Sequence, residues 1–376
     1  MTASELREQA GYVGDAVKIA AYEAALAALA PGQVVLDLGA GSGLLGFLAA
    51  RAGAKHVYAV DSGAIVGVVR EVAAANEMAS VEPIRGMSTR IELPQPVSLA
   101  VCDQIGGLVY DAGVLQYFAD ARKRLLTDDA VLVPSNFRLF VAPASCPSVR
   151  DQITLWRSRP AGFDFSAFGS SAVNTEHRID DGACRVIGTP VGVGAIKADH
   201  IDPILGEGSS TIVDRGQFDG IVGWFEADMG GGAMLTNEPG SLSRFQRWCN
   251  FYPIDEAVLL DVGDRVDVSI DIRPASYSVT WKITITNASG TQVQTERHST
   301  LLGQFMGAEE LRRDRTEPVG PTPVGRLVAR ALALAESGRP IEDIMAELRG
   351  SSESEWTKKL ESDVRDSLRK FTRPIA

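Results

Sequence analysis

Three glycines and two acidic residues occupy the positions of the sequence whose spacing is most informative chemically. Gly39, Gly41 and Gly43 follow the apolar segment VVLDL, which contains Asp37, and Asp61 ends the next apolar segment, HVYAVD. Glycines in a turn between a strand and a helix let the backbone approach a ligand closely. An acid at the end of the following strand can accept hydrogen bonds from both hydroxyls of a ribose. The pattern therefore predicts a ligand that contains a nucleoside.

The spacing of these glycines separates two classes of nucleoside ligand. A dinucleotide-binding turn that starts at Gly39 requires glycine at position 44, where the sequence has Leu44. The carboxylate of Asp37 would repel a pyrophosphate, but it suits a ligand with a positive end, such as S-adenosylmethionine. We therefore predict an S-adenosylmethionine site. The alternatives are a nicotinamide or flavin cofactor and a glycine turn that binds no ligand.

The elements that must position this motif alternate between strands and helices over about 140 residues. Hydrophobic periodicity and turn residues predict strands and helices in the following ranges. The strands are expected at 34–39, 56–61, 81–86, 97–103 and 130–133, and the helices at 15–30, 44–53, 62–78 and 111–126. Such alternation predicts a doubly wound α/β sheet with its ligand at the carboxyl ends of the strands.

The character of the sequence changes twice after this region. From about 148 to 305 the sequence has short alternating or apolar runs, and these predict a second, mostly antiparallel β domain. Near Glu309 the pattern becomes helical again, with helices expected at 324–337, 340–349 and 355–371. We therefore predict three regions, with the boundaries 1–142, 143–308 and 309–376.

Composition excludes several classes of partner. The chain has 37 Lys and Arg against 48 Asp and Glu, a net charge of −11, which disfavours duplex nucleic acid and anionic membranes as ligands. We find no apolar run of the ~20 residues that a membrane span needs and no secretory signal. Four cysteines and four histidines are scattered, so neither a metal site nor a disulfide framework is expected. Cytoplasm is the expected location.

Several segments together resemble the protein arginine methyltransferase family. DLGAGSGLLGFLAARAGAKHVYAVD looks like the cofactor-binding stretch of that family, and YVGDAVKIAAYEAAL is similar to its cofactor-closing helix. GFDFSAF, FDGIVGWFEADM and IDIRPAS resemble landmarks of its β-barrel. The resemblance covers roughly residues 10–290. It implies a Rossmann-like methyltransferase domain, then a β-barrel with a dimerisation arm at about 166–186, and a homodimer. The C-terminal helical extension lies outside the resemblance.

The resemblance also implies a set of cofactor contacts. Asp15 and Lys18 lie on the closing helix, and Lys18 is expected to face the methionine carboxylate. The alternative for Lys18 is a solvated helix face. Asp61 is expected to take the ribose hydroxyls. The other implied contacts are Asp37, Gly39, Gly41, Gly43, Ser62, Gly86, Met87 and Ser88.

The loop that follows the fourth expected strand departs from the family. There the family carries two glutamates that grip a guanidinium, whereas this sequence reads CDQIGGLVYDAG. Asp103 stands at the first glutamate, and Asp111 falls one position before the second. We predict Asp103 to orient or deprotonate the acceptor, with a strand-end cap as the alternative. Asp111 is the second catalytic candidate, or else the N-cap of the helix at 112–126.

A second departure concerns the Thr-His-Trp element of the family's barrel. The corresponding stretch, SLSRFQRWCNFYP, contains no histidine and places Arg244 and Arg247 in the neighbourhood. Such a cationic lip would repel a guanidinium and attract a carboxylate or phosphate. Tyr110 and Trp248 are further candidates for the substrate pocket, with packing as the alternative.

These departures lead us to predict a methyltransferase with an altered acceptor. We expect a small-molecule or peptide natural-product-type acceptor, and poor methylation of arginine in histone-like peptides. One alternative is a divergent protein arginine N-methyltransferase, and another is a non-catalytic binding module of the same fold. The C-terminal helices are similar to small winged-helix modules that bind leader peptides. This similarity predicts that they dock a peptide. The alternative is a helical cap that packs on the enzyme and closes its pocket.

Overall fold

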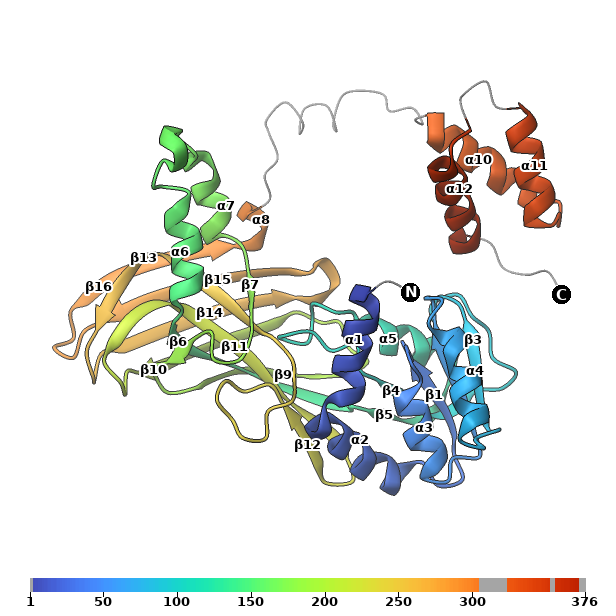
Figure 1. The fold of residues 1–376 in the computed structure, drawn as a ribbon. Coiled ribbons are helices and arrows are strands. Elements are labelled where there is room, and N and C mark those ends of the chain that lie inside the picture. The colour runs from blue at the N-terminus through green and yellow to red at the C-terminus, as the bar shows by residue number, and fades with distance from the viewer. Residues whose placement is uncertain (1–2, 304–322, 352–355, 372–376) are drawn as a thin grey trace. The chain divides into compact units, whose positions relative to one another are not determined.

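The computed structural model describes residues 3–303, 323–351 and 356–371 (Figure 1). The chain divides into two compact units, residues 1–305 and 306–376. The first unit contains a parallel sheet and an antiparallel β-barrel region, in the predicted order. Among the described residues, no helix combines the length and apolarity needed to span a membrane.

The parallel sheet has five strands in the order β3-β2-β1-β4-β5. Its strands are β1 (Val34–Leu38), β2 (His56–Asp61), β3 (Val81–Arg85), β4 (Val97–Cys102) and β5 (Leu126–Val133). The central strands β1 and β4 are almost fully buried, which explains why their sequences are continuous apolar runs rather than alternating ones. The order reverses between β1 and β4, so their carboxyl ends form the switch point at which such sheets bind ligands.

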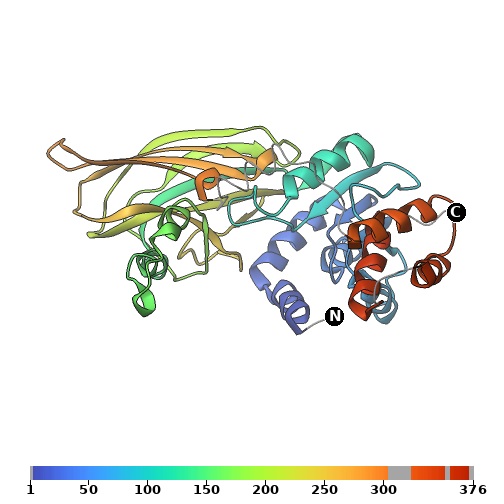
Figure 2. The same cartoon turned by 90° about the horizontal axis from the view of Figure 1, so that it is seen from above.

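Helices cover the parallel sheet and connect it to the barrel. They are α1 (Ala3–Gly14), α2 (Ala16–Leu29), α3 (Leu44–Arg51), α4 (Val66–Ala75) and α5 (Val114–Arg124). The sequence analysis did not predict α1, and the other four lie within the predicted ranges. Helix α2 lies between the parallel sheet and the barrel hairpin of β11 (Gly216–Gly230) and β12 (Ala233–Thr236) (Figures 1 and 2).

The antiparallel region consists of two sheets. One has the order β10-β14-β15-β16, and the other has the order β7-β13-β11-β6-β8, with β12 on β11 and β9 on β6. Their remaining strands are β6 (Asn136–Ser145), β7 (His177–Ile179), β8 (Arg185–Val186), β9 (Val191–Lys197), β10 (Ile204–Thr211), β13 (Cys249–Leu260), β14 (Arg265–Arg273), β15 (Ser278–Thr286) and β16 (Gln292–Ser299). A turn at 287–290 joins β15 to β16.

Two details of the barrel differ from expectation. Strand β6 begins at Asn136 and pairs with β11, so the antiparallel region starts before the boundary expected at residue 143. The helices α6 (Pro147–Leu155) and α7 (Gly169–Val173) project from it (Figure 1). The expected arm, 166–186, is only partly in this projection, because β7 and β8 pair with β13 and β6.

The second unit is a cluster of three helices, α10 (Pro323–Ala335), α11 (Ile341–Ser351) and α12 (Lys358–Phe371), as the sequence predicts. Their apolar faces close on one another around a small core of their own. This core contains Ala331, Ile344, Met345, Leu348, Val364 and Leu368. Within residues 323–351 and 356–371 there is no strand, so the described part of this unit lacks the wing of a winged-helix module.

Candidate active site

The glycine turn lies at the carboxyl end of β1, next to the acid that ends β2. Gly39, Gly41 and Gly43 all have positive φ, a conformation that only glycine adopts without strain. The carboxylate of Asp61 accepts hydrogen bonds from Gly41 N at 2.9 Å and from Gly63 N at 2.6 Å. These bonds fix Asp61 beside the turn, as a ribose site requires, and leave lone pairs on both carboxylate oxygens.

Asp37 lies beneath the turn with one unused acceptor. Its Oδ2 accepts a hydrogen bond from Gly46 N at 2.8 Å, and its buried Oδ1 has no partner among the described residues. Burial raises the pKa of the Asp37 carboxyl to about 7, against the lowering effect of the Gly46 bond. A positively charged ligand in the turn would stabilise the ionised form. These residues therefore fit S-adenosylmethionine.

Two glutamines lie over the glycine turn. Gln9 on α1 accepts a hydrogen bond from Ser42 N at 3.2 Å and lies against Gly41. A Cβ atom at Gly39 would come within 2.9 Å of Gln104 Cγ. The turn is thus in contact both with the N-terminal helix and with the loop after β4, which brings the cofactor and acceptor regions together.

The expected adenine segment follows β3. Gly86 N donates to Asp61 O at 2.9 Å, so this segment lies next to the end of β2. Met87 is partly exposed there, and Ser88 O accepts a hydrogen bond from Arg124 at 2.7 Å. Ser62 is exposed beside Asp61. Contact of these residues with a cofactor stays a prediction.

Asp15 has a structural role in addition to the predicted cofactor contact, which stays a prediction. It is the N-cap of α2, and its Oδ1 accepts a hydrogen bond from Lys18 N at 3.1 Å. Its Oδ2 accepts a bond from Gln246 N at 2.7 Å. Because both oxygens of this buried carboxylate are engaged, Asp15 fastens α2 to the segment that replaces the Thr-His-Trp element.

Asp103, at the end of β4, holds two buried cations. Lys18 Nζ lies 2.6 Å from Asp103 Oδ2, and Arg247 Nη2 lies 3.1 Å from Asp103 Oδ1. The Lys18 and Arg247 side chains are each only 3% exposed. The alternative of a solvated helix face for Lys18 is therefore wrong. Arg247 lies beside the predicted catalytic acid, as expected.

Aromatic rings surround the Arg247 guanidinium. Its Cζ lies 5.6 Å from the ring centroid of Tyr12, 5.5 Å from that of Phe245 and 5.2 Å from that of Trp248. Arg178 Cζ lies 4.6 Å from the Trp248 ring. Cation–π attraction thus links both arginines to one indole.

The Asp111 carboxylate stabilises the conformation of the loop after β4. It accepts hydrogen bonds from Gly107 N at 3.2 Å, from Leu108 N at 3.3 Å and from Trp248 Nε1 at 3.3 Å. The N-cap of α5 is Gly113, so the N-cap hypothesis for Asp111 is wrong. These bonds maintain a strained loop, because the β-branched Val109 within it has φ +71°.

Two predicted substrate residues have other roles. Tyr110 is buried in the core, where its hydroxyl lies 3.3 Å from that of Tyr252. The Arg244 guanidinium donates to the carbonyls of Asn237 and Arg247, so it braces the segment instead of forming a cationic lip. Trp248 is partly buried between the two arginines and remains a pocket candidate.

Sequence reasoning missed an acid and a base in the expected arm. Glu176 directly precedes β7 and accepts a long hydrogen bond from Asn250 Nδ2 at 3.4 Å, and Arg178 lies 3.9 Å from Asp111. Burial raises the pKa of the Glu176 carboxyl to about 7. Their polar surroundings in the sequence resemble a solvated loop and carry no motif. Gln9, Tyr12 and Gln104 were missed for the same reason.

Comparison with known proteins supports a methyltransferase. A family model described as ribosomal protein L11 methyltransferase matches residues 17–135. The rice protein arginine N-methyltransferase PRMT10 is 36% identical over 146 residues, 38% of each chain. The Arabidopsis probable histone-arginine methyltransferase 1.3 is 36% identical over 30% of this chain and 22% of its own. The chain thus spans well under half the length of these relatives.

A bacterial relative and two solved structures match more of the chain. The arginine N(omega)-methyltransferase of Streptomyces achromogenes is 29% identical over 62% of this chain and 67% of its own. Arabidopsis protein arginine methyltransferase 10 matches 78% of this chain with TM-score 0.65 and 20% identity. The Trypanosoma brucei PRMT1 enzyme-prozyme complex with AdoHcy matches 77%, also with TM-score 0.65, at 16% identity. In cofactor motif and in fold, the chain therefore resembles the S-adenosylmethionine-dependent protein arginine methyltransferases.

Proposed function

We propose that the chain transfers a methyl group from S-adenosylmethionine to a guanidino nitrogen of arginine. The observation that carries the proposal is the carboxylate of Asp103, which holds the guanidinium of Arg247 at 3.1 Å beside the cofactor turn. Once Lys18 pairs with the cofactor carboxylate instead, Asp103 Oδ2 would be free to hold the guanidinium of an acceptor. The names of the rice and Streptomyces relatives both specify arginine, which favours this acceptor over an unrelated small molecule.

The residues of the turn would hold the cofactor. Asp61 would accept the ribose hydroxyls, the three glycines would line the methionine part, and Lys18 would face the methionine carboxylate. When bound, S-adenosylmethionine supplies a sulfonium methyl group for in-line displacement by nitrogen, with S-adenosylhomocysteine as the leaving product. Asp103 would align the guanidinium and accept the proton that the nitrogen loses.

The ion pair between Lys18 and Asp103 implies an order of binding. Lys18 Nζ lies 2.6 Å from Asp103 Oδ2, so an acceptor guanidinium at this oxygen would meet a second cation while the pair is intact. A methionine carboxylate would draw Lys18 away and release Oδ2. We therefore expect the acceptor to bind after the cofactor.

The direct test is product analysis with the full chain and isotopically labelled S-adenosylmethionine. We expect Nω-methylarginine by mass spectrometry. Asp103→Asn should lose turnover, whereas Asp103→Glu, which keeps the charge, and the exposed Asp128→Asn should retain it. Cofactor binding measured on the same samples checks that each variant is folded. A chain that binds the cofactor but methylates no guanidinium would support the non-catalytic alternative instead.

We also propose a homodimer, with the projection of α6 and α7 as the contact. Near its tip, Phe163 is 67% exposed, and Leu155 and Phe168 are also exposed although they are apolar. Light scattering at micromolar concentration should report a dimer that Phe163→Asp weakens. A particle of 40.1 kDa would contradict the proposal.

The role of the C-terminal unit and a cytoplasmic location stay proposals. Deletion of residues 321–376 separates the two hypotheses for this unit. A soluble remainder that binds cofactor and loses only affinity for its acceptor supports peptide docking. Aggregation or loss of cofactor binding supports a structural cap.

A further inference from the structure

We infer that the acceptor is a free α-amino acid whose carboxylate and ammonium groups bind Arg178 and Glu176, while its guanidinium reaches Asp103. The inference rests on the proposed guanidino methylation and specifies the substrate class of the same site. It arises from the acid and the base beside Trp248, which neither the cofactor motif nor the loop acids account for.

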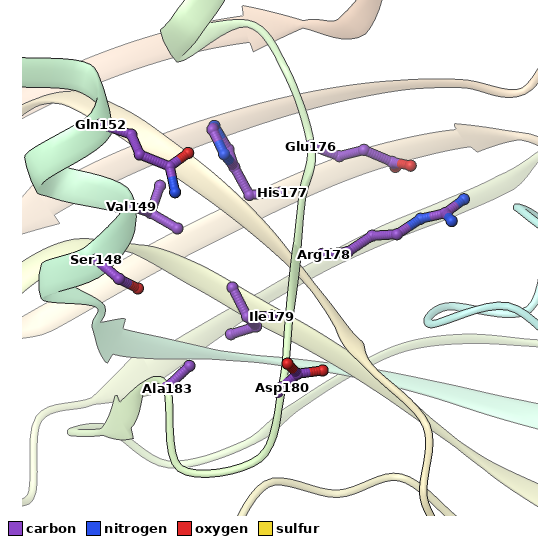
Figure 3. Close-up of a pocket in the computed structure, with 9 residues that line it drawn as sticks. All are labelled: Ser148, Val149, Gln152, Glu176, His177, Arg178, Ile179, Asp180 and Ala183. Atoms are coloured by element: carbon purple, nitrogen blue, oxygen red, sulfur yellow. The ribbon is translucent and has the colours of Figure 1, made fainter. Parts of the chain in front are cut away.

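Glu176 and Arg178 lie on the same side of one extended segment. They are two residues apart, and successive side chains of a strand point to opposite faces. Figure 3 shows both side chains directed away from α6, whereas His177 and Ile179 point toward it. Their side chains thus lie on the face of this segment opposite the α6 residues Ser148, Val149 and Gln152. An acid and a base at this spacing match the two charges of an amino-acid head group.

Both side chains retain hydrogen-bonding capacity for a ligand. Arg178 is 56% exposed, and its 3.9 Å separation from Asp111 exceeds hydrogen-bond distance. Glu176 forms no ion pair within 4.0 Å among the described residues, and its bond from Asn250 is long. Asn250 itself is buried, and its Oδ1 lacks a partner in the described part of the chain. Buried polar groups of this kind normally have partners.

One indole ring separates this pair from the catalytic acid. Arg178 Cζ and Arg247 Cζ lie 4.6 and 5.2 Å from the Trp248 ring centroid, and Arg247 in turn contacts Asp103 at 3.1 Å. In the inferred complex, the side chain of a free arginine lies along Trp248, between these two ends. Its head group would then lie at β7 and its guanidinium at Asp103.

An arginine within a polypeptide lacks both head-group charges. Bound in the same place, it would displace water from Glu176 and Arg178 without supplying a charge to either side chain. Binding would therefore be weaker. A site built to bind polar groups rejects analogues that lack them. This explains how the chain can use guanidino chemistry and still discriminate against protein arginine.

The test compares four acceptors with the full chain: L-arginine, agmatine without the carboxylate, Nα-acetyl-L-arginine without the ammonium, and a peptide with an internal arginine. We expect kcat/KM to be highest for L-arginine, by about 10- to 100-fold over the other three. Turnover of agmatine and of the internal-arginine peptide as efficient as that of L-arginine would overturn the inference.

Variants locate the two charges. Arg178→Gln should raise KM for L-arginine about tenfold or more and leave KM for agmatine unchanged, with partial rescue by Arg178→Lys. Glu176→Gln should also raise KM for L-arginine, but it should leave KM for Nα-acetyl-L-arginine unchanged. The exposed Arg215→Gln and Glu256→Gln are matched controls. If Arg178→Gln affects L-arginine and agmatine equally, the residue is structural and the inference fails.

Failure of the proposed reaction remains distinguishable from failure of this inference. Calorimetry of L-arginine with the chain saturated by S-adenosylhomocysteine measures head-group binding without turnover. Binding that Arg178→Gln weakens supports the inference even if no guanidinium is methylated. Absence of L-arginine binding, together with methylation of the internal-arginine peptide, overturns the inference and retains the proposed function.

Discussion

The cofactor region and the acceptor region lie side by side but are held together by different forces. The cofactor region is formed by one continuous segment, 37–63, in which backbone amides of Gly41, Gly46 and Gly63 bond to two carboxylates. In the acceptor region, side chains from 12–18, 103–111, 176–178 and 244–250 contact one another.

This difference determines what one substitution can do. In the cofactor region the carboxylates bond to neutral backbone amides, so a substitution there removes hydrogen bonds but leaves no buried charge unpaired. In the acceptor region Asp103 balances two buried cations, so removing it leaves Lys18 and Arg247 uncompensated. The acceptor region is therefore expected to be the more fragile of the two, and the following experiments test that contrast.

The largest effect is expected from Asp103→Asn. It leaves Lys18 and Arg247, both nearly fully buried, without a counter-charge, so the free energy of unfolding should fall by about 3–5 kcal/mol. Urea denaturation measures this fall in the free energy of unfolding. The double variant with Arg247→Met should recover part of the loss. An unchanged unfolding midpoint would show that the pairs are solvated and the contrast is wrong.

A smaller effect, mainly on ligand binding, is expected from Asp61→Ala. The variant loses the acceptor for the ribose, and affinity for S-adenosylmethionine should fall by about 1–3 kcal/mol. Calorimetry provides the measurement, with Asp128→Ala as the exposed control. Unchanged affinity would remove Asp61 from the cofactor site.

Gly39→Ala and Gly32→Ala separate backbone strain from ligand contact. Both glycines have φ near +74°. The Cβ atom of an alanine would meet Gln104 at position 39, whereas at position 32 it would have no atom within 4 Å. Each variant should lose about 1–2 kcal/mol of stability, because left-handed backbone is unfavourable for alanine. Only Gly39→Ala should also weaken cofactor binding, as calorimetry would reveal. Equal cofactor affinity in the two variants would contradict the predicted contact.

The smallest expected effect is a pH dependence. Burial raises the pKa of the Glu176 carboxyl to about 7, while Arg178 on the same segment opposes the shift. Tyr252 also interacts electrostatically with Glu176, and the hydrogen bond from Asn250 lowers the Glu176 pKa. The carboxyl is neutral below that pKa and cannot hold an ammonium, so KM for L-arginine should fall about tenfold between pH of about 6 and 8. Steady-state kinetics should show this fall, and Glu176→Gln should abolish it.

The cofactor region could be predicted because its information is local. Val34 to Asp61 form one strand–turn–helix–strand sequence, and periodicity and glycine spacing determine where each residue lies. The family resemblance then located Asp103 and the 241–253 segment.

The acceptor region could not be predicted in the same way, because pairing across distant segments decides its geometry. Glu176 and Arg178 look like solvated loop residues until β7 pairs with β13. Arg244 and Arg247 are neighbours in the sequence, yet one braces carbonyls and the other contacts Asp103. Tyr110 looks like a pocket residue and is buried against Tyr252.

Lys18 is one cation shared by two anionic sites, and thermodynamic linkage makes that sharing reciprocal. If a methionine carboxylate draws Lys18 from Asp103 and strengthens acceptor binding by some factor, then acceptor binding must strengthen cofactor binding by the same factor. Replacing Lys18 would weaken the affinity for the cofactor, free Asp103 Oδ2 for the acceptor even without the cofactor, and remove the coupling between the two sites. With Lys18 in place, the cofactor-bound chain would be the form that recognises its acceptor, and a cofactor whose methyl group has been spent but whose carboxylate remains would retain that recognition.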